Sequence, residues 1–451
     1  MMARAKKEAA LTPEERLQAA LVPDWEWPYK LPKNWCWTTV GTICDGFQYG
    51  YTEKATFEKI GPHFIRITDI GDGIINDSGA PYCKIDSDSF IKYKINKDDI
   101  LIARMGSVGE NGLATHNIDG VFASYLIRIV PRSNTKYVCN FLQTNLYWGQ
   151  ISEKAQGTTR LNVNANVLKN LIIPLPPLAE QQRIVDRIES LFAKLDEAKE
   201  KAQAVVDSFE TRKAAILHKA FTGELTAKWR EEHGVRMESW KVRTLDSVCS
   251  SIFDGDHMPP PKAESGIPFL VISNVNTGHL TFENTRFVPQ EYYDTLSDTR
   301  KPQLGDVLYT LVGSFGIPVV VNSKRPFCFQ RHMALLRPID VSPQFLWYIL
   351  QTPEMYDKAS SIATGTAQLT VPIKGLRAMT IPRPNIAEQV EIVRILDGFF
   401  AREQSAKEAA EAVLDQIDLM KKSILARAFR GELGTNDPSE ESAVELLKQL
   451  I

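Results

Sequence analysis

Apolar residues follow two different spacings along this chain of 451 residues. One spacing belongs to short runs rich in β-branched and aromatic residues, separated by Gly, Asn and Pro, such as FIRITDI (64–70), DILIARM (99–105) and YLIRIVP (125–131). Runs of this kind are typical of short β-strands joined by turns. The regions 35–177 and 240–385, which contain these runs, are therefore expected to form mixed α+β domains.

The other spacing is that of a long amphipathic helix, and it occurs twice. Apolar residues or alanines alternate at four and three residues for more than three heptads, which indicates a coiled-coil seam. Gly223 and Gly431 are expected to end the two helices, because glycine is favoured just past a helix C-terminus. The first seam is Ile184, Ile188, Leu191, Leu195, Ala198, Ala202, Val205 and Phe209, and the second is Ile392, Leu396, Phe399, Glu403, Ala406, Ala410, Val413 and Ile417.

The chain contains an internal repeat. Residues 155–185 align without gaps to residues 363–393, and 14 of those 31 positions are identical, where unrelated segments would share roughly two. AFTGEL (220–225) matches AFRGEL (428–433) at the same offset of 208 residues, whereas the earlier parts of the halves pair at offsets of 205 to 207. Two copies of one unit are therefore expected, with a shared framework and different loops.

The two long helices are expected to pack on each other. A helix of about 44 residues cannot bury its seam alone, and the chain must return between the copies, so the pair is expected to run antiparallel. The alternative is that each helix packs only on its own domain, but the helices share length and register where the domains do not. Glu403 stands where the first seam has Leu195, which predicts a polar contact or an offset between the helices.

Both ends of the chain carry helix-start signals. Thr12-Pro13-Glu14-Glu15 has the pattern of a capping box with proline at the first helical position, and Asp437-Pro438-Ser439-Glu440 is its near-copy before SAVELLKQLI. Each segment could be a solvated tail, or it could dock on a partner.

Composition limits the class of protein. The chain has 43% hydrophobic and 24% charged residues, has no run near the ~20 apolar residues of a membrane span, and lacks an apolar signal core at its start. A cytoplasmic protein without membrane contact is expected. The six cysteines form no C-x-x-C pair, so they are expected to be core thiols and not zinc ligands. The net charge of −2 does not by itself suggest a nucleic-acid partner.

The sequence shows no motif for chemistry. It contains no G-x-x-x-x-G-K-[ST] loop and no H-E-x-x-H pair, and no Asn/Asp-Pro-Pro-aromatic run. GSVGENG (106–112) lacks the G-x-G-x-x-G order, and its counterpart VGSFGIP (312–318) indicates a structural turn after a strand. Asp24, Glu26 and Lys30 have no strand context for a nuclease site. The chain is therefore expected to be non-catalytic, with no cofactor and no metal of its own.

These features together resemble one known family. The doubled G-T-x-x-L-x-V…I-P-x-P…A-E-Q…I-V segment, the heptad helix ending A-F-x-G-E-L, and the D-D-I-L and G-D-V-L strands running into G-S-x-G are similar to the specificity (S) subunits of Type I restriction–modification enzymes. The resemblance covers Trp35 to Leu433. It implies that two target-recognition domains each read half of a split, asymmetric site in double-stranded DNA, and that helices between them set the gap.

The resemblance also implies partners. Two modification (M) subunits would carry S-adenosylmethionine and methylate adenine N6, and two restriction (R) subunits would add ATP- and Mg-dependent translocation and cleavage. Partners of this kind would supply phosphate contacts, which agrees with the neutral charge. Two other classes stay open, namely an enzyme whose motif is not visible and a coiled-coil scaffold without DNA specificity.

The expected architecture is an α+β protein with an internal pseudo-twofold repeat, in which two mixed α/β recognition domains are separated by two long antiparallel coiled-coil helices. The expected segments are an N-terminal segment with a short helix (1–34), recognition domain 1 (35–177), spacer helix 1 (178–222), a linker (223–239), recognition domain 2 (240–385), spacer helix 2 (386–430) and a C-terminal tail (431–451).

Candidate base-reading residues are polar or aromatic side chains where the framework of the repeat ends or its loops diverge, because direct readout needs hydrogen-bonding groups on groove-facing loops. They are Gln48, Tyr49, Arg66, Arg104, Ser107 and Arg160 in the first domain, and Asp254, His257, Ser314, Arg331, His332 and Gln368 in the second.

Overall fold

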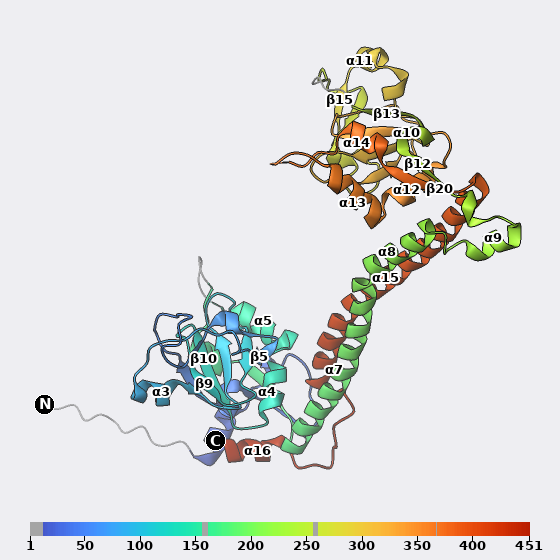
Figure 1. The fold of residues 1–451 in the computed structure, drawn as a ribbon. Helices are drawn as coiled ribbons and strands as arrows, with labels where there is room; N and C mark the ends of the chain where they lie inside the picture. The colour runs from blue at the N-terminus through green and yellow to red at the C-terminus, as the bar shows by residue number, and fades with distance from the viewer. Residues whose placement is uncertain (1–11, 156–160, 256–259, 367) are drawn as a thin grey trace. The chain divides into compact units, whose positions relative to one another are not determined.

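The computed structural model describes residues 12–155, 161–255, 260–366 and 368–451. The chain forms two compact units, of which the first contains residues 1–202 and 412–451 and the second contains residues 203–411 (Figure 1). Each unit holds one of the two expected recognition domains and a part of each long helix.

The recognition domain of the first unit is built on three small sheets with the strand orders β1-β11, β2-β10-β7-β8-β5-β4 and β3-β9-β6. The short helices between the strands begin at side-chain caps, for example at Asn134 and Thr144. The strands are β1 (Cys36–Thr39), β2 (Cys44–Tyr49), β3 (His63–Ile65), β4 (Ile70–Gly71), β5 (Gly73–Ile75), β6 (Lys94–Ile95), β7 (Ile100–Ala103), β8 (Asn111–Leu113), β9 (Ile118–Phe122), β10 (Leu126–Pro131) and β11 (Ile172–Leu175). The helices are α1 (Pro13–Ala20), α2 (Val40–Ile43), α3 (Ser87–Tyr93), α4 (Thr135–Phe141), α5 (Asn145–Lys154) and α6 (Ala165–Lys169).

The recognition domain of the second unit repeats this plan with fewer strands, in the orders β12-β20, β13-β19-β16-β17 and β15-β14-β18. The strands are β12 (Lys241–Thr244), β13 (Cys249–Asp254), β14 (Ile267–Leu270), β15 (Arg286–Val288), β16 (Val307–Thr310), β17 (Pro318–Val320), β18 (Cys328–Phe329), β19 (Met333–Pro338) and β20 (Thr380–Arg383). The helices are α10 (Leu245–Val248), α11 (Gln290–Thr295), α12 (Pro343–Leu350), α13 (Pro353–Ile362) and α14 (Ile373–Ala378).

The long helices pack antiparallel within each unit. In the first unit, the start of α7 (Leu178–Asp207) lies along the end of α15 (Ile386–Ala428), and Lys421 contacts Asp196 at 2.5 Å. In the second unit, α8 (Phe209–Phe221) lies along the first part of α15, and Lys407 lies over the ring of Phe209. Pairing of the two spacer helices, expected from the repeat, is thus observed in both units.

The first spacer helix is not one continuous helix, as the sequence analysis expected, but breaks at Ser208 between α7 and α8. The Ser208 hydroxyl donates to the backbone oxygen of Ala204, a bond that bends helices. Arg212 donates to the Val205 carbonyl at 3.2 Å and to Ser208 Oγ, while its Nε donates to Glu403 at 2.7 Å. The polar contact expected at Glu403 therefore exists, and it stabilises the break.

The seam on α15 also differs from the expected register. Ala406 and Val413 are exposed, whereas Lys407 and Leu414 are partly buried beside the buried Ala410 and its neighbours along the helix. From Glu403 onward, the partly or fully buried residues of the helix follow a spacing of four and then three residues. Every second buried position therefore lies one residue later than expected. The sequence pattern therefore predicted the spacing but placed two of the eight seam positions, Ala406 and Val413, one residue too early.

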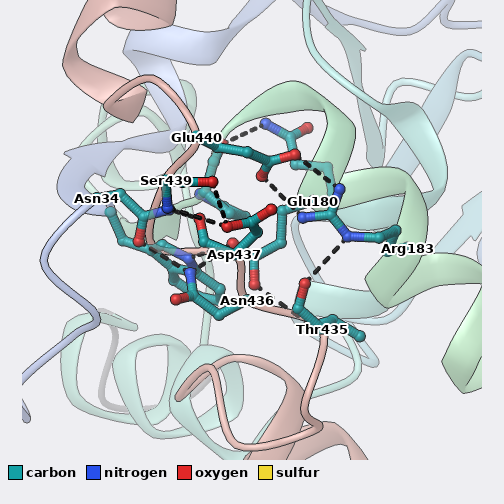
Figure 2. A network of polar contacts seen from close by, with 11 residues as sticks. Asn34, Glu180, Arg183, Thr435, Asn436, Asp437, Ser439 and Glu440 are labelled. Carbon is teal, nitrogen blue, oxygen red and sulfur yellow. Dashed lines mark hydrogen bonds and ion pairs between the residues drawn. The ribbon is translucent and has the colours of Figure 1, made fainter.

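The C-terminal tail docks on the first unit, and it is not a solvated tail. Ala443 and Leu447 of α16 (Ala443–Leu450) are buried in the first core, and α16 packs against α1. The backbone N–H of Ala443 donates to the Asn34 carbonyl at 2.8 Å, and Arg183 holds Glu440 in a two-pronged ion pair (Figure 2). Both terminal helices thus belong to this unit.

A buried carboxylate lies at the centre of the tail's polar contacts. Glu180 has no solvent exposure; its Oε2 accepts from Trp35 Nε1 and Asn436 Nδ2, both at 2.8 Å, and its Oε1 accepts from Thr435 at 3.3 Å (Figure 2). The equivalent carboxylate in the second unit is Glu388, which is also fully buried. The repeat therefore places one acidic side chain at the same joint, where a spacer helix begins, in both units.

The run FIRITDI was expected to form one strand, but β3 ends at Ile65 and a 3-10 turn follows. Asp69 explains the change, because its carboxylate accepts from the backbone N–H of Arg66 at 2.8 Å and closes the turn. Asn274 makes the same bond to the N–H of Val271 in the second domain, at 3.0 Å. A side chain that bonds the backbone three residues earlier thus competes with strand pairing.

Each unit has its own hydrophobic core. The first core combines residues of domain 1 with Ile184 and Ile188 of α7, and the second combines residues of domain 2 with Ile392 and Leu396 of α15. All six cysteines lie in the described ranges and are buried thiols outside any disulfide, as expected for core residues. Within the described ranges, no helix has both the length and the apolarity needed to cross a bilayer.

Candidate nucleic-acid interface

The two recognition domains share one backbone arrangement, the frame. In it, the residue that follows β7 or β16 bonds to the residue just before β10 or β19. In the first domain the N–H of Arg104 donates to the carbonyl of Tyr125 at 2.9 Å, and in the second the N–H of Leu311 donates to the carbonyl of His332 at 2.8 Å. Both pairs stand at the repeat offset of 207 residues. The frame therefore presents different side chains from the same backbone position.

The close approach of two segments is the same in both frames. A side chain at Gly50 would place its Cβ 2.3 Å from the Phe122 carbonyl oxygen, and one at Gly255 would place it 2.3 Å from the Phe329 carbonyl oxygen. Only glycine fits at such a distance from backbone. Because these contacts are equivalent, the loops at residues 123–125 and 330–332 are held in the same way next to the ends of β2 and β13.

The turns after β7 and β16 are equivalent as well. Gly106 and Gly109 have φ values of 73° and 91°, and Gly313 and Gly316 have 72° and 90°. This matching geometry agrees with the structural turn expected for the GSVG segment, as opposed to a phosphate cradle. Ser107 and Ser314, both candidate residues, are exposed in these turns.

In the first domain, Tyr49 and Arg104 are brought together. The Arg104 guanidinium lies over the Tyr49 ring, 4.7 Å from its centroid, and the Tyr49 hydroxyl accepts from the Ala165 N–H at 3.0 Å. Next to them is a depression of about 390 Å³ that Arg66, Ser124 and Tyr125 help to line. The candidate face of this domain is thus rich in aromatic and basic side chains, with Glu53 also lining the depression.

In the second domain, four candidates line one depression of about 410 Å³, namely Asp254, Arg331, His332 and Gln368. Burial, and then the Arg331 charge, lower the pKa of His332 below its usual value, so its ring is neutral at pH 7. Gln330 Nε2 contacts His332 Nδ1, and a neutral ring that accepts at Nδ1 carries its proton on Nε2. This face is polar, with both donors and acceptors.

Two candidates of the first domain are engaged within the protein. Gln48 accepts from Arg128 and donates to the Lys92 carbonyl at 3.2 Å. Arg66 donates to Asp69 through Nε at 3.0 Å and Nη2 at 2.9 Å, and these hydrogen bonds raise the pKa of its guanidinium. Two other candidates, Arg160 and His257, lie outside the described residues.

Tyr125 is a surface residue that the sequence analysis did not select. Its side chain is 54% exposed, and it stands beside Arg104 in the loop before β10. The repeat could have indicated Tyr125. The candidates Arg331 and His332 align with Ser124 and Tyr125 at the offset of 207 residues. Among the described residues, the structure shows no group of His, Cys, Asp and Glu placed to hold a metal.

Two copies of one domain that present unlike polar faces from one frame define a recognition protein that reads two different targets. A comparison with known families agrees. Residues 38–206 and 237–414 match the model of the Type I restriction modification DNA specificity domain. Since these two matches cover most of the chain, the chain belongs to this family, and it is a specificity subunit of the Type I restriction–modification class.

Curated relatives match along most of their length. The chain is 26% identical over 430 residues to the specificity subunit of the Type I restriction enzyme EcoKI from Escherichia coli K12, with 90% of each chain covered. It is 25% identical over 364 residues to the MjaVIII specificity subunit from Methanocaldococcus jannaschii, which covers 75% of this chain and 80% of the relative.

Solved structures show the same fold. The HsdS subunit from Thermoanaerobacter tengcongensis aligns with a TM-score of 0.63 at 22% identity, and a chain from a study of the assembly and conformational transition of the type I R-M system aligns with a TM-score of 0.66 at 22% identity. Each alignment covers 90% of this chain and 100% of the other.

Proposed function

We propose that this chain is the DNA-reading subunit of a Type I restriction–modification complex, in which each recognition domain reads one half of a bipartite, asymmetric site in double-stranded DNA. The observation that carries the proposal is the shared frame with unlike side chains. One backbone presents Arg104 and Tyr125 in the first domain and Leu311 and His332 in the second. Two domains with the same backbone frame and different side chains support the recognition of two different DNA sequences.

The chemistry belongs to other subunits. M subunits with S-adenosylmethionine methylate the site, and R subunits with ATP and Mg cleave the DNA, while this cytoplasmic chain selects where they act. The chain's net charge of −2 supports a division in which partners supply many of the phosphate contacts on which affinity for DNA depends.

We expect two M subunits per chain, because each unit offers a similar helical surface to the same partner. Native mass spectrometry of the co-expressed complex should give two M subunits for one S chain. A dominant complex with one M subunit, at saturating M, would contradict this expectation.

A methyl-transfer assay separates the remaining classes. Transfer should require the chain and M subunits together with S-adenosylmethionine, and it should occur at one DNA site. Transfer by the purified chain alone would support an enzyme. DNA binding without sequence preference in the presence of M subunits would support a scaffold.

A further inference from the structure

Arg104 is a basic side chain whose guanidinium has no hydrogen bond and no acidic partner among the described residues. Its Nε is buried and has no hydrogen bond, and neither the Nε nor the terminal nitrogens has an acceptor or an acidic partner among the described residues. The residue as a whole is partly exposed, and only its Nε is enclosed. Arg128 and Arg337, in contrast, are paired with Asp99 and Asp306. Arg104 therefore keeps free donors at the candidate face.

The repeat shows that the fold does not need this arginine. The equivalent residue is Leu311, which is 3% exposed and makes the same backbone hydrogen bond. The strands on both sides pair in the same register, Ala103 with Leu126 and Thr310 with Met333. Arg104 is thus an addition to the framework, in a loop region where the two domains differ.

The Arg104 guanidinium lies against an aromatic ring. The Tyr49 ring lies beneath it, and the bond from Ala165 N–H to the Tyr49 hydroxyl fixes that ring. A ring beneath the guanidinium reduces the freedom of the arginine, and the donors of a guanidinium are coplanar. A planar pair of donors matches two acceptors in one plane.

On this basis we infer that Arg104 reads a guanine in the half-site of the first domain, by donating from its two terminal nitrogens to O6 and N7. The inference rests on the proposed function. Guanine presents these two acceptors side by side in the major groove, and arginine is their commonest partner. A phosphate also offers two acceptors to an arginine fork. Arg104 stands where the side chains of the two domains differ, however, so a base, which carries the sequence information, is the favoured partner.

The test uses the complex of the chain with M subunits and three variants. R104L installs the residue that the second domain carries at this position, so it should unfold at the temperature of the parent. R104K keeps the charge without the planar fork. Y49L removes the ring beneath the guanidinium. Each complex is titrated with DNA in which one half-site position is varied, and methylated sites are mapped.

R104L is expected to weaken binding to the parent site about five- to 150-fold and to relax one guanine position of the first half-site, leaving the second half-site unchanged. R104K should relax the same position. Y49L should weaken binding in the same direction by a smaller factor. Replacing that guanine by 7-deazaguanine, which lacks N7, should weaken the parent complex and have no effect on R104L.

If R104L instead binds all sequences more weakly by the same factor, and the salt dependence of its binding falls by about one charge, Arg104 contacts a phosphate. That result would overturn the inference. An R104L variant that keeps full selectivity would also overturn it, as would a first half-site without guanine. The 7-deazaguanine arm needs no variant, so it decides even if R104L folds poorly. If the parent complex shows no bipartite selectivity at all, the proposed function fails as well.

Discussion

Exchanging residues 35–177 for the matching domain of a relative is expected to change one half of the recognised DNA site and to leave the other half unchanged. The reason is that the frame around Arg104 and Tyr125 lies wholly within these residues, and the frame around Leu311 and His332 lies wholly outside them. Each mismatched base pair costs about 1–3 kcal/mol. If the exchange changes three positions of the half-site, the affinity for the parent sequence should therefore fall by at least about a hundredfold.

The exchange must keep the contacts between the domain and the helices of its unit. Trp35 donates to Glu180 at 2.8 Å, and the rings of Tyr137 and Phe141 lie 4.8 and 5.7 Å from that of Phe429. The donor domain should therefore carry tryptophan and the two aromatic residues at these positions. The matched control exchanges residues 240–385 and should change the other half. Altered methylation in both halves after a single exchange would show that the domains read jointly.

The substitution E388Q is expected to destabilise the second unit by about 3–5 kcal/mol, whereas E180Q should cost the first unit about 1 kcal/mol or less. Both carboxylates are fully buried, but their partners differ. Glu388 Oε1 accepts from Arg230 at 2.7 Å and from Thr226 at 2.8 Å, and its Oε2 accepts from Trp240 at 2.9 Å. Loss of this charge leaves the buried Arg230 uncompensated.

Glu180 has only neutral donors. A glutamine at this position can keep its amide oxygen toward Trp35 and Asn436 and turn its NH2 toward the Thr435 hydroxyl, which can accept. The measurement is urea unfolding of each variant, combined with hydrogen exchange of β12 and β20 for E388Q and of β1 and β11 for E180Q. Equal losses for the two variants would contradict the assignment of Arg230 as the cause.

Much of the fold was predictable because it depends on local signals. The positive φ of Gly223 and Gly431, 85° and 73°, follows from their place after the long helices. The capping box of Thr12 and Glu15 is present, with both of its hydrogen bonds. The repeat indicated the equivalence of the two domains, since it is a comparison within one chain and does not need the fold.

The features that were missed depend on contacts between distant residues. The break at Ser208 is accompanied by a hydrogen bond from Arg212 to Glu403, which is 191 residues later in the chain. The docking of the tail requires Asn34 to meet Asp437 and Ala443. No spacing along a sequence reports such pairs, although Glu403 did stand out as a polar residue in an apolar seam.

The candidate site was predictable in part for the same reason. Divergence between repeats indicated Tyr49, Arg104 and His332, which the structure places on the equivalent faces. It could not indicate that the polar groups of Gln48 and Arg66 are bound within the protein. The bonds to their partners, Arg128 and Asp69, form only in the folded structure. A polar residue in a variable loop is therefore a candidate whose availability only the structure can test.

The central claim is that one chain reads two unlike DNA elements through two copies of one frame. Single-molecule sequencing of DNA from cells that carry the chain with its M subunits, compared with cells that lack the chain, tests this claim most directly. Methylated adenines are expected in one motif made of two different elements separated by a gap of constant length. An uninterrupted motif, two identical halves, or methylation that does not depend on the chain would contradict it.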